Sequence, residues 1–257
     1  IKAKPGGRVV GFAEKQPAPP RSKPVLASMG IYVFDTEALV AALSEDARSS
    51  ASHHDFGRDV IPRMVAQGQR VFAYNADEEQ GRDSFYWRDI GVIDSYWEAS
   101  MELLEDDSPF DLFDRNWPIY SYQPVSPPAR VLHQETPGSG LDRSLLSPGV
   151  TISGARVDRS ILSPGVRIER GAEVTESVLL DGVHVGEGAR IHRAIIGANV
   201  TVPQDYSVGV NAERDRMRFD ISPNGVVVVA GITPRDDLER FLSPYSFEMA
   251  PMGAGSN

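Results

Sequence analysis

An internal repeat in the second half of the sequence constrains the fold more than any other feature. Residues 145–152, LLSPGVTI, return as residues 161–168, ILSPGVRI, and more loosely as residues 178–185 and 195–202, at spacings of 16, 17 and 17 residues. Aliphatic residues that recur about every six positions among small and polar residues are typical of hexapeptide coils, and about three hexapeptides complete one turn. The repeat therefore predicts a left-handed parallel β-helix, with Gly, Asn and Asp at its tight corners.

The first half has a different pattern, in which short apolar runs alternate with amphipathic segments. The expected strands are residues 8–12, 25–34 and 71–74, and the expected helices follow Asp35, cover residues 56–67 and begin near Gly91. Asp35 or Thr36 and then Asp55 are suited to cap the first two helices. Alternating strands and helices are typical of a mainly parallel sheet covered on both faces, so we expect an α/β domain over residues 1–112. Residues 113–257 are expected to form a connector and the β-helix domain.

Composition limits the possible function classes. The chain has 26 Lys plus Arg against 36 Asp plus Glu, a net charge of −10, and no basic run that could follow a nucleic acid backbone. The absence of cysteine excludes disulfides, thiolate metal sites and cysteine nucleophiles. No run approaches about 18 consecutive apolar residues, and the N-terminus lacks a signal-peptide pattern. We therefore expect a cytoplasmic protein that binds neither nucleic acid nor a membrane.

One of the four lysines is placed where a ligand could bind. Lys15 follows Glu14 at the end of an expected strand, and open α/β sheets usually bind ligands beyond the carboxyl ends of their strands. The ammonium could hold a sugar phosphate, and Glu14 could accept hydrogen bonds from sugar hydroxyls. An exposed ion pair explains the same two residues more simply.

The run at residues 27–34 offers a second candidate surface. Alternation along a strand places Ser28, Gly30, Tyr32 and Phe34 on one face. A face that begins with small and hydroxylic residues could receive a ligand close to the backbone. Packing of both faces against helices, with Ser28 bonded locally, is the alternative.

Asp89 precedes the third expected helix and could either cap it or bind a divalent cation that carries substrate phosphates. The sequence has neither GxGxxG after a strand nor GxxxxGK[ST], so it has no glycine-rich phosphate loop. In the β-helix, His184 and His192 are the candidate bases for acyl transfer, with inert exposed side chains as the alternative.

Five motifs occur in an order that resembles bacterial glucose-1-phosphate adenylyltransferases. They are FAEK at residues 12–15, ASMGIYVF at 27–34, HDFGRD at 54–59, YWRDIG at 86–91 and DRNWPI at 114–119. The hexapeptide region follows where that family has its left-handed β-helix. The resemblance implies a Rossmann-like α/β nucleotidyltransferase domain of the GT-A type that transfers AMP from ATP to glucose 1-phosphate in glycogen biosynthesis. It also implies a homotetramer and small-molecule allosteric effectors.

The resemblance implies roles for individual residues as well. The sugar-phosphate site would consist of Glu14, Lys15, Ser28, Tyr32 and Trp87. Asp89 would help to hold the catalytic Mg²⁺. Two positions depart from the family, since Gln16 replaces a proline and Val92 a threonine.

The resemblance places the family's glycine-rich nucleotide loop and second metal aspartate upstream of Ile1. We therefore expect only part of the catalytic domain, no complete catalytic set, and no activity from this chain alone. Residues 231–257 also lack the basic helix that contacts regulators in some members. The competing hypotheses are a thymidylyl- or uridylyltransferase, a hexapeptide acyltransferase, and a noncatalytic regulatory subunit.

Overall fold

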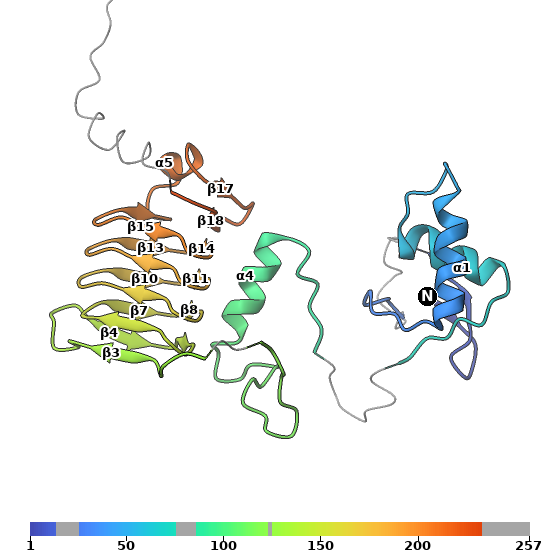
Figure 1. Ribbon diagram of the computed structural model, residues 1–257, viewed down its shortest axis with the longest axis horizontal. Helices are drawn as coiled ribbons and strands as arrows, with labels where there is room; N and C mark the ends of the chain where they lie inside the picture. The colour runs from blue at the N-terminus through green and yellow to red at the C-terminus, as the bar shows by residue number, and fades with distance from the viewer. Residues whose placement is uncertain (14–25, 76–85, 123–124, 233–257) are drawn as a thin grey trace, which may run out of the picture. The chain divides into compact units, whose positions relative to one another are not determined.

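The computed structural model describes residues 1–13, 26–75, 86–122 and 125–232 (Figure 1). The chain divides into two compact units, Ile1–Asp89 and Ile90–Asn257, and each unit is described by itself. Among the described residues, no helix has both the length and the apolar character needed to cross a membrane.

The first unit combines a small antiparallel sheet with three helical segments. β1 (Lys2–Ala3) pairs with β2 (Val9–Gly11), and an antiparallel bridge joins Arg8 to Phe72. The helical segments are α1 (Thr36–Ala47), the π-helical turn η1 (Phe56–Val60) and α2 (Ile61–Ala66). The core consists of Ala42, Val60 and Met64, with Phe34, Phe56 and Val71 packed against them.

Two aspartates cap the helical segments as the sequence predicts. The Asp35 carboxylate accepts hydrogen bonds from the N–H groups of Glu37 and Ala38 at 3.1 and 3.3 Å, and Asp55 accepts one from Arg58 at 2.8 Å. These bonds engage N–H groups that have no partner within the first helical turn. The expected helix over residues 56–67 is therefore confirmed, with its first turn π-helical.

The expected strand over residues 25–34 is not formed in its described part. Among the described residues no strand pairs with this segment, and Ile31 and Val33 are 71% and 99% exposed. Its β-branched and aromatic residues favour extended backbone, but a strand also requires a neighbour that takes up its backbone hydrogen bonds. The expectation of parallel pairing is also wrong for the described strands of this unit, which pair antiparallel.

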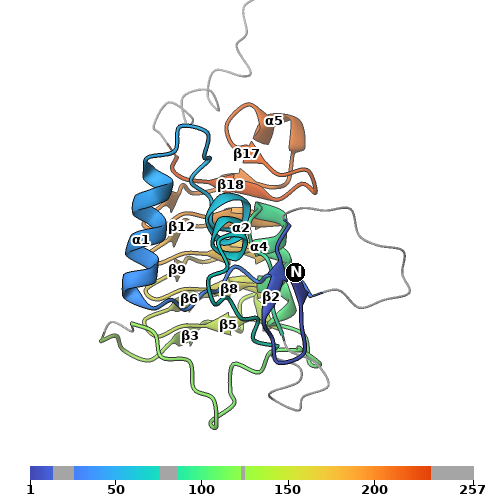
Figure 2. The same cartoon turned by 90° about the vertical axis from the view of Figure 1, so that its right-hand side faces the viewer.

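The second unit contains the predicted parallel β-helix, whose coils stack as three sheets (Figure 2). The first sheet holds β3 (Arg130–Leu132), β6 (Thr151–Ser153), β9 (Arg167–Ile168), β12 (His184–Val185) and β15 (Thr201–Val202). The second holds β4 (Gly140–Asp142), β7 (Arg156–Asp158), β10 (Glu173–Thr175), β13 (Arg190–His192) and β16 (Ser207–Val208). The third holds β5 (Leu145–Leu146), β8 (Ile161–Leu162), β11 (Val178–Leu179), β14 (Ala194–Ile196) and β18 (Val227–Val229), with β17 (Asp220–Ile221) antiparallel to β18.

The repeated octapeptides stack in register in the third sheet. Leu145 pairs with Ile161, Ile161 with Val178, and Val178 with Ile195. The next residue of each repeat points inward, so Leu162, Leu179 and Ile196 are fully buried in the core. The spacing of the repeats therefore predicted both the fold of this unit and the register of its strands.

Helix α4 (Ile93–Glu102) packs against the outside of the third sheet. Trp97, Met101 and Leu104 contact Val178 and Ile195 there. The sequence-based division at residue 112 assigns this helix to the first domain, whereas the structure places it in the second unit. The physical reason is the apolar stripe of α4, which the outward aliphatic side chains of the coils cover. Beyond the last full coil, α5 (Ala212–Arg216) and β17 lie at the C-terminal end of the β-helix (Figure 1).

Candidate functional site

A small polar and aromatic surface in the first unit contains two of the predicted sugar-phosphate residues. The hydroxyl oxygens of Ser28 and Tyr32 lie 3.0 Å apart, and the N–H of Gly30 donates to Ser28 Oγ at 3.2 Å. The chain bends at Gly30, where φ is 74°, and this bend rather than the alternation of a strand brings the two hydroxyls together. Ser28 is exposed and Tyr32 is half-buried, so the pair can reach a ligand in solvent.

Phe56 packs against the aromatic residues of this surface. Its ring stacks on that of Tyr32, with 5.9 Å between centroids and an interplanar angle of 27°, and its centroid lies 5.7 Å from that of Phe34. Offset aromatic contacts at this range hold rings in place while leaving one face open. We define Ser28, Tyr32 and Phe56 as the Tyr32 surface. Sugar rings present apolar C–H faces as well as hydroxyls, and the Tyr32 surface offers partners for both.

The sequence marked Phe56 only as the first residue of the expected helix over residues 56–67 and as part of the HDFGRD motif. Twenty-four positions separate it from Tyr32 (56 − 32), and no local periodicity links them. The signal that could have identified it is its position directly after the capping Asp55, where a first-turn side chain faces the incoming chain.

The other predicted site residues lie on different segments of the chain. Glu14 and Lys15 lie outside the described residues. Trp87 and Asp89 lie on the irregular stretch 86–92, where Trp87 is 41% exposed and Asp89 is exposed. In the described parts of the chain, the aromatic contacts of Tyr32 are made with Phe34 and Phe56.

Asp89 does not cap the helix that follows it. The N-cap of α4 is Val92, which makes no side-chain capping bond, so the capping alternative is wrong. An exposed carboxylate is a hard oxygen ligand suited to Mg²⁺, which typically binds one or two carboxylates together with substrate phosphates. No group of three or more His, Asp or Glu side chains among the described residues could hold a metal by itself.

The two histidines of the β-helix lie on different sheets. His184 Nε2 is 3.1 Å from Glu169 Oε1 on the first sheet, and His192 Nδ1 is 2.9 Å from Thr175 Oγ1 on the second. Their side chains stand on flat strand surfaces and already have local partners. This arrangement favours a structural role over acyl transfer.

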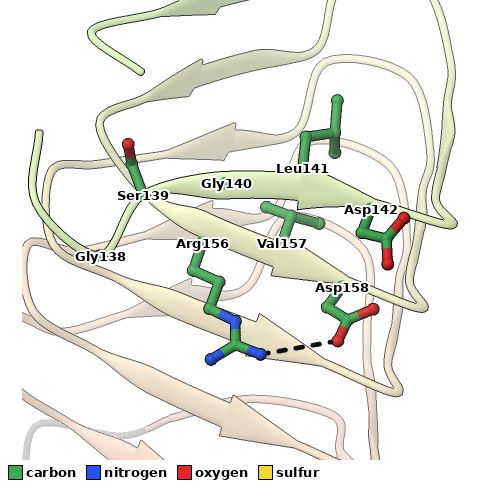
Figure 3. Close-up of a pocket in the computed structure, with 8 residues that line it drawn as sticks. All are labelled: Gly138, Ser139, Gly140, Leu141, Asp142, Arg156, Val157 and Asp158. Carbon is green, nitrogen blue, oxygen red and sulfur yellow. Dashed lines mark ion pairs between the residues drawn. The ribbon is translucent and has the colours of Figure 1, made fainter. Parts of the chain in front are cut away.

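A shallow cavity of about 380 Å³ opens on the second sheet, at β4 and β7 (Figure 3). Two of its charged lining residues are paired, because Arg156 lies 3.7 Å from the Asp158 carboxylate. It contains no histidine and none of the predicted site residues. The Tyr32 surface, and not this cavity, is therefore the candidate site.

Comparison with known proteins gives matches in both halves of the chain. Residues 1–106 match the family described as nucleotidyl transferase, and residues 127–229 match the GlmU-like, C-terminal hexapeptide family. The chain is 38% identical over 231 residues to glucose-1-phosphate adenylyltransferase 1 of Vibrio parahaemolyticus, covering 87% of this chain and 56% of the relative. It is 42% identical over 227 residues to the glucose-1-phosphate adenylyltransferase of Methylococcus capsulatus, covering 86% and 53%. It is 44% identical over 229 residues to glucose-1-phosphate adenylyltransferase 2 of Vibrio cholerae, covering 86% and 56%. The chain thus spans about half the length of the curated relatives it matches.

Proposed function

Since the chain joins a nucleotidyl transferase segment to a hexapeptide β-helix and is a relative of the glucose-1-phosphate adenylyltransferases, we propose that it carries the sugar-phosphate side of such an enzyme. The reaction is the transfer of AMP from ATP to glucose 1-phosphate, which yields ADP-glucose and diphosphate for glycogen biosynthesis. The single observation that carries this proposal is the Ser28–Tyr32 hydroxyl pair above the ring of Phe56.

Each residue has a distinct part in binding. Ser28 and Tyr32 would form hydrogen bonds with sugar hydroxyls, and the ring of Phe56 would hold the Tyr32 ring in place by stacking on it. Lys15 would neutralise the charge of the sugar phosphate, and Glu14 and Trp87 would contribute further contacts to the sugar. The phosphate is thereby held for in-line attack on the α-phosphorus of ATP, a reaction in which positioning and charge neutralisation provide most of the rate acceleration.

Asp89 would hold Mg²⁺ together with phosphate oxygens. The ion, when bound, offsets the negative charge that develops between the two phosphates. A single carboxylate binds Mg²⁺ weakly, so we expect Asp89 to contribute mainly when substrate is present.

The β-helix would serve as a platform for self-association and for effector binding. At its first coil, Val131 and Leu141 occupy positions that are buried in the following coils, yet they are 36% and 41% exposed. Incompletely covered ends of repeat domains favour contacts with other surfaces. A homotetramer is the assembly that we propose, and sedimentation of the protein at several concentrations measures it.

Calorimetric titration with glucose 1-phosphate tests the proposed binding. We expect the chain to bind this ligand, and Lys15→Ala to weaken binding by about ten- to one-hundredfold, since a hydrogen bond to a charged group is worth roughly 1.5–3 kcal/mol. Because the sequence contains no glycine-rich phosphate loop, we expect no ADP-glucose from ATP and glucose 1-phosphate with this chain alone. Failure to bind glucose 1-phosphate would contradict the proposal.

The nucleotide is a separate question, because a thymidylyl- or uridylyltransferase would also bind glucose 1-phosphate. Parallel titrations with ADP-glucose, UDP-glucose and dTDP-glucose compare the three bases on the same protein. Preference for ADP-glucose supports adenylyl transfer. Preference for another sugar nucleotide would replace it with the corresponding enzyme.

A further inference from the structure

A buried carboxylate lies near the end of α1, away from the Tyr32 surface. Asp46 is 3% exposed, and both of its oxygens are engaged. Oδ1 accepts the hydroxyl of Ser52 at 2.6 Å and lies 3.2 Å from Arg63 Nη1, while Oδ2 lies 2.7 Å from His54 Nδ1. The hydrogen bonds from Ser52 and His54, with the charge of Arg63, lower the pKa of Asp46 in spite of its burial. The carboxylate is therefore charged at neutral pH, and both of its oxygens are bonded to neighbouring side chains.

These neighbours belong to the loop that leads into η1 and to α2. The N–H of His54 donates to Ser52 Oγ at 3.0 Å, which closes a tight turn in which His54 has a φ of 59°. A histidine rarely adopts this left-handed conformation, so the loop needs contacts that hold it. Asp46 provides two of them directly, and together the bonds fix the course of residues 52–54.

The loop ends at the residue that supports Tyr32. Asp55 caps η1 through its bond to the N–H of Arg58, and Phe56 follows at once. The backbone position of Phe56 is therefore set by the loop on one side and by η1 on the other. Its ring then contacts Tyr32 at 5.9 Å and Phe34 at 5.7 Å.

We propose that Asp46 is a positioning residue for the Tyr32 surface, acting through Ser52, His54 and Phe56. The carboxylate draws the loop toward α1, the loop places Phe56, and Phe56 holds the Tyr32 ring at the angle at which its hydroxyl meets Ser28. Binding sites require their side chains within about 0.5 Å of the productive geometry, and an aromatic ring carried by a loop meets this requirement only when the loop is fixed. The part of this inference that concerns sugar-phosphate affinity rests on the proposed function, whereas the part that concerns Phe56 and Tyr32 does not.

The test compares Asp46→Asn with Glu45→Gln in the full 257-residue chain. Asparagine has nearly the same shape as aspartate but loses the charge and one acceptor. Glu45 is the matched control because it is an exposed carboxylate on the same helix, and its partner is Gln67, the C-cap of α2, at 2.8 and 3.1 Å. Ser52→Ala is a second variant, which removes the two bonds of the Ser52 hydroxyl, one to Asp46 and one from the N–H of His54, and leaves the carboxylate in place.

Two measurements separate positioning from general stability. Ring-to-ring NOEs between Tyr32 and Phe56 report the stacking directly, and calorimetry reports glucose 1-phosphate affinity. We expect Asp46→Asn and Ser52→Ala to weaken these NOEs and to reduce affinity by about tenfold, while Glu45→Gln leaves both unchanged and backbone amide spectra show that all variants are folded.

Each outcome has a defined meaning. Unchanged NOEs in folded Asp46→Asn or Ser52→Ala would overturn the inference, as would weakened NOEs with unchanged affinity. If Asp46→Asn does not fold, Ser52→Ala decides by the same two measurements. If the unmodified chain does not bind glucose 1-phosphate while the NOEs respond as expected, the proposed function fails and the positioning of Phe56 by Asp46 stands.

Discussion

The indole N–H of Trp97 on α4 donates to the backbone carbonyl of Glu176 in the β-helix, at 2.8 Å. The Arg193 guanidinium lies 4.0 Å from the centroid of the same indole and 3.5 Å from the Glu176 carboxylate. An apolar ring, a hydrogen bond and a cation therefore meet at one corner of the coil. This corner attaches α4 to the β-helix, although α4 lies within residues 1–106, which match the nucleotidyl transferase family.

Replacing Trp97 should detach α4. Trp97→Ala removes a side chain that is 7% exposed, and we expect the free energy of unfolding to fall by about 3–5 kcal/mol. Trp97→Phe retains a ring but not the donor, and should cost about 1–3 kcal/mol because a buried carbonyl loses its partner. Urea denaturation followed by circular dichroism measures both. Equal losses in the two variants would show that the hydrogen bond, and not the packing, holds the helix.

Gly209 should tolerate no side chain. Its φ is 75°, and a Cβ there would collide with the backbone carbonyl of His192. Gly225 is the matched control because its φ is 86° and a Cβ would meet no atom within 4 Å. Gly225→Ala should cost about 1–2 kcal/mol for the left-handed conformation alone, and Gly209→Ala should cost clearly more. Thermal unfolding of the two variants under the same conditions gives the difference, and equal melting temperatures would contradict the expected collision.

Asp215 should make the C-terminal end of the β-helix depend on pH. It is 2% exposed, and burial raises its pKa above the ordinary value of 3.8, although its bonds to the N–H groups of Gly209 and Asn211 oppose this. The folded state then holds the proton more strongly than the unfolded state does. The stabilisation is present below pH 3.8 and is lost as the pH rises through the raised pKa.

Asp215→Asn should remove this dependence, because asparagine can still accept from Gly209 without carrying a charge. We expect the melting temperature of Asp215→Asn to increase relative to that of the original chain as the pH rises from about 4 to about 7. Asp220→Asn, at an exposed position on β17, is the control. If the melting temperatures of Asp215→Asn and the original chain differ by the same amount across this pH range, the pKa of Asp215 is not raised by folding.

Tyr32→Phe should separate the hydroxyl of the Tyr32 surface from its ring. Phenylalanine keeps the stack on Phe56 and loses the contact with Ser28 at 3.0 Å. Affinity for glucose 1-phosphate should fall by about three- to tenfold, the value of one neutral hydrogen bond. Tyr74→Phe, at a tyrosine that is 66% exposed in the same unit, should bind as the original chain does. Unchanged affinity in Tyr32→Phe would remove the hydroxyl from the proposed site.

The sequence predicted best those features that neighbouring residues decide. The octapeptide repeat predicted the register of Leu145, Ile161, Val178 and Ile195, because each coil contacts mainly the next and identical coils stack on themselves. The caps at Asp35 and Asp55 were also predictable, because a capping side chain bonds to N–H groups two or three residues away.

Features that depend on distant parts of the chain were missed or predicted wrongly. Residues 26–34 have the composition of a strand, but pairing requires a neighbour that composition does not reveal. Asp89 has the right residue type for a cap, but α4 begins beyond its reach, at Ile93. The apolar stripe of α4 was visible in the sequence, whereas the surface that covers it was not.

The sequence by itself determined the β-helix and the helix caps, since periodicity and capping act over a few residues. The roles of Ser28 and Tyr32 in binding stay predictions that the family resemblance implies. Only the tertiary structure placed Phe56 against Tyr32, connected Asp46 to the loop that carries Phe56, and assigned α4 to the β-helix. Contacts of this kind join residues that are far apart in the chain, and burial, ring packing and buried charge pairing select them only when the whole unit is folded.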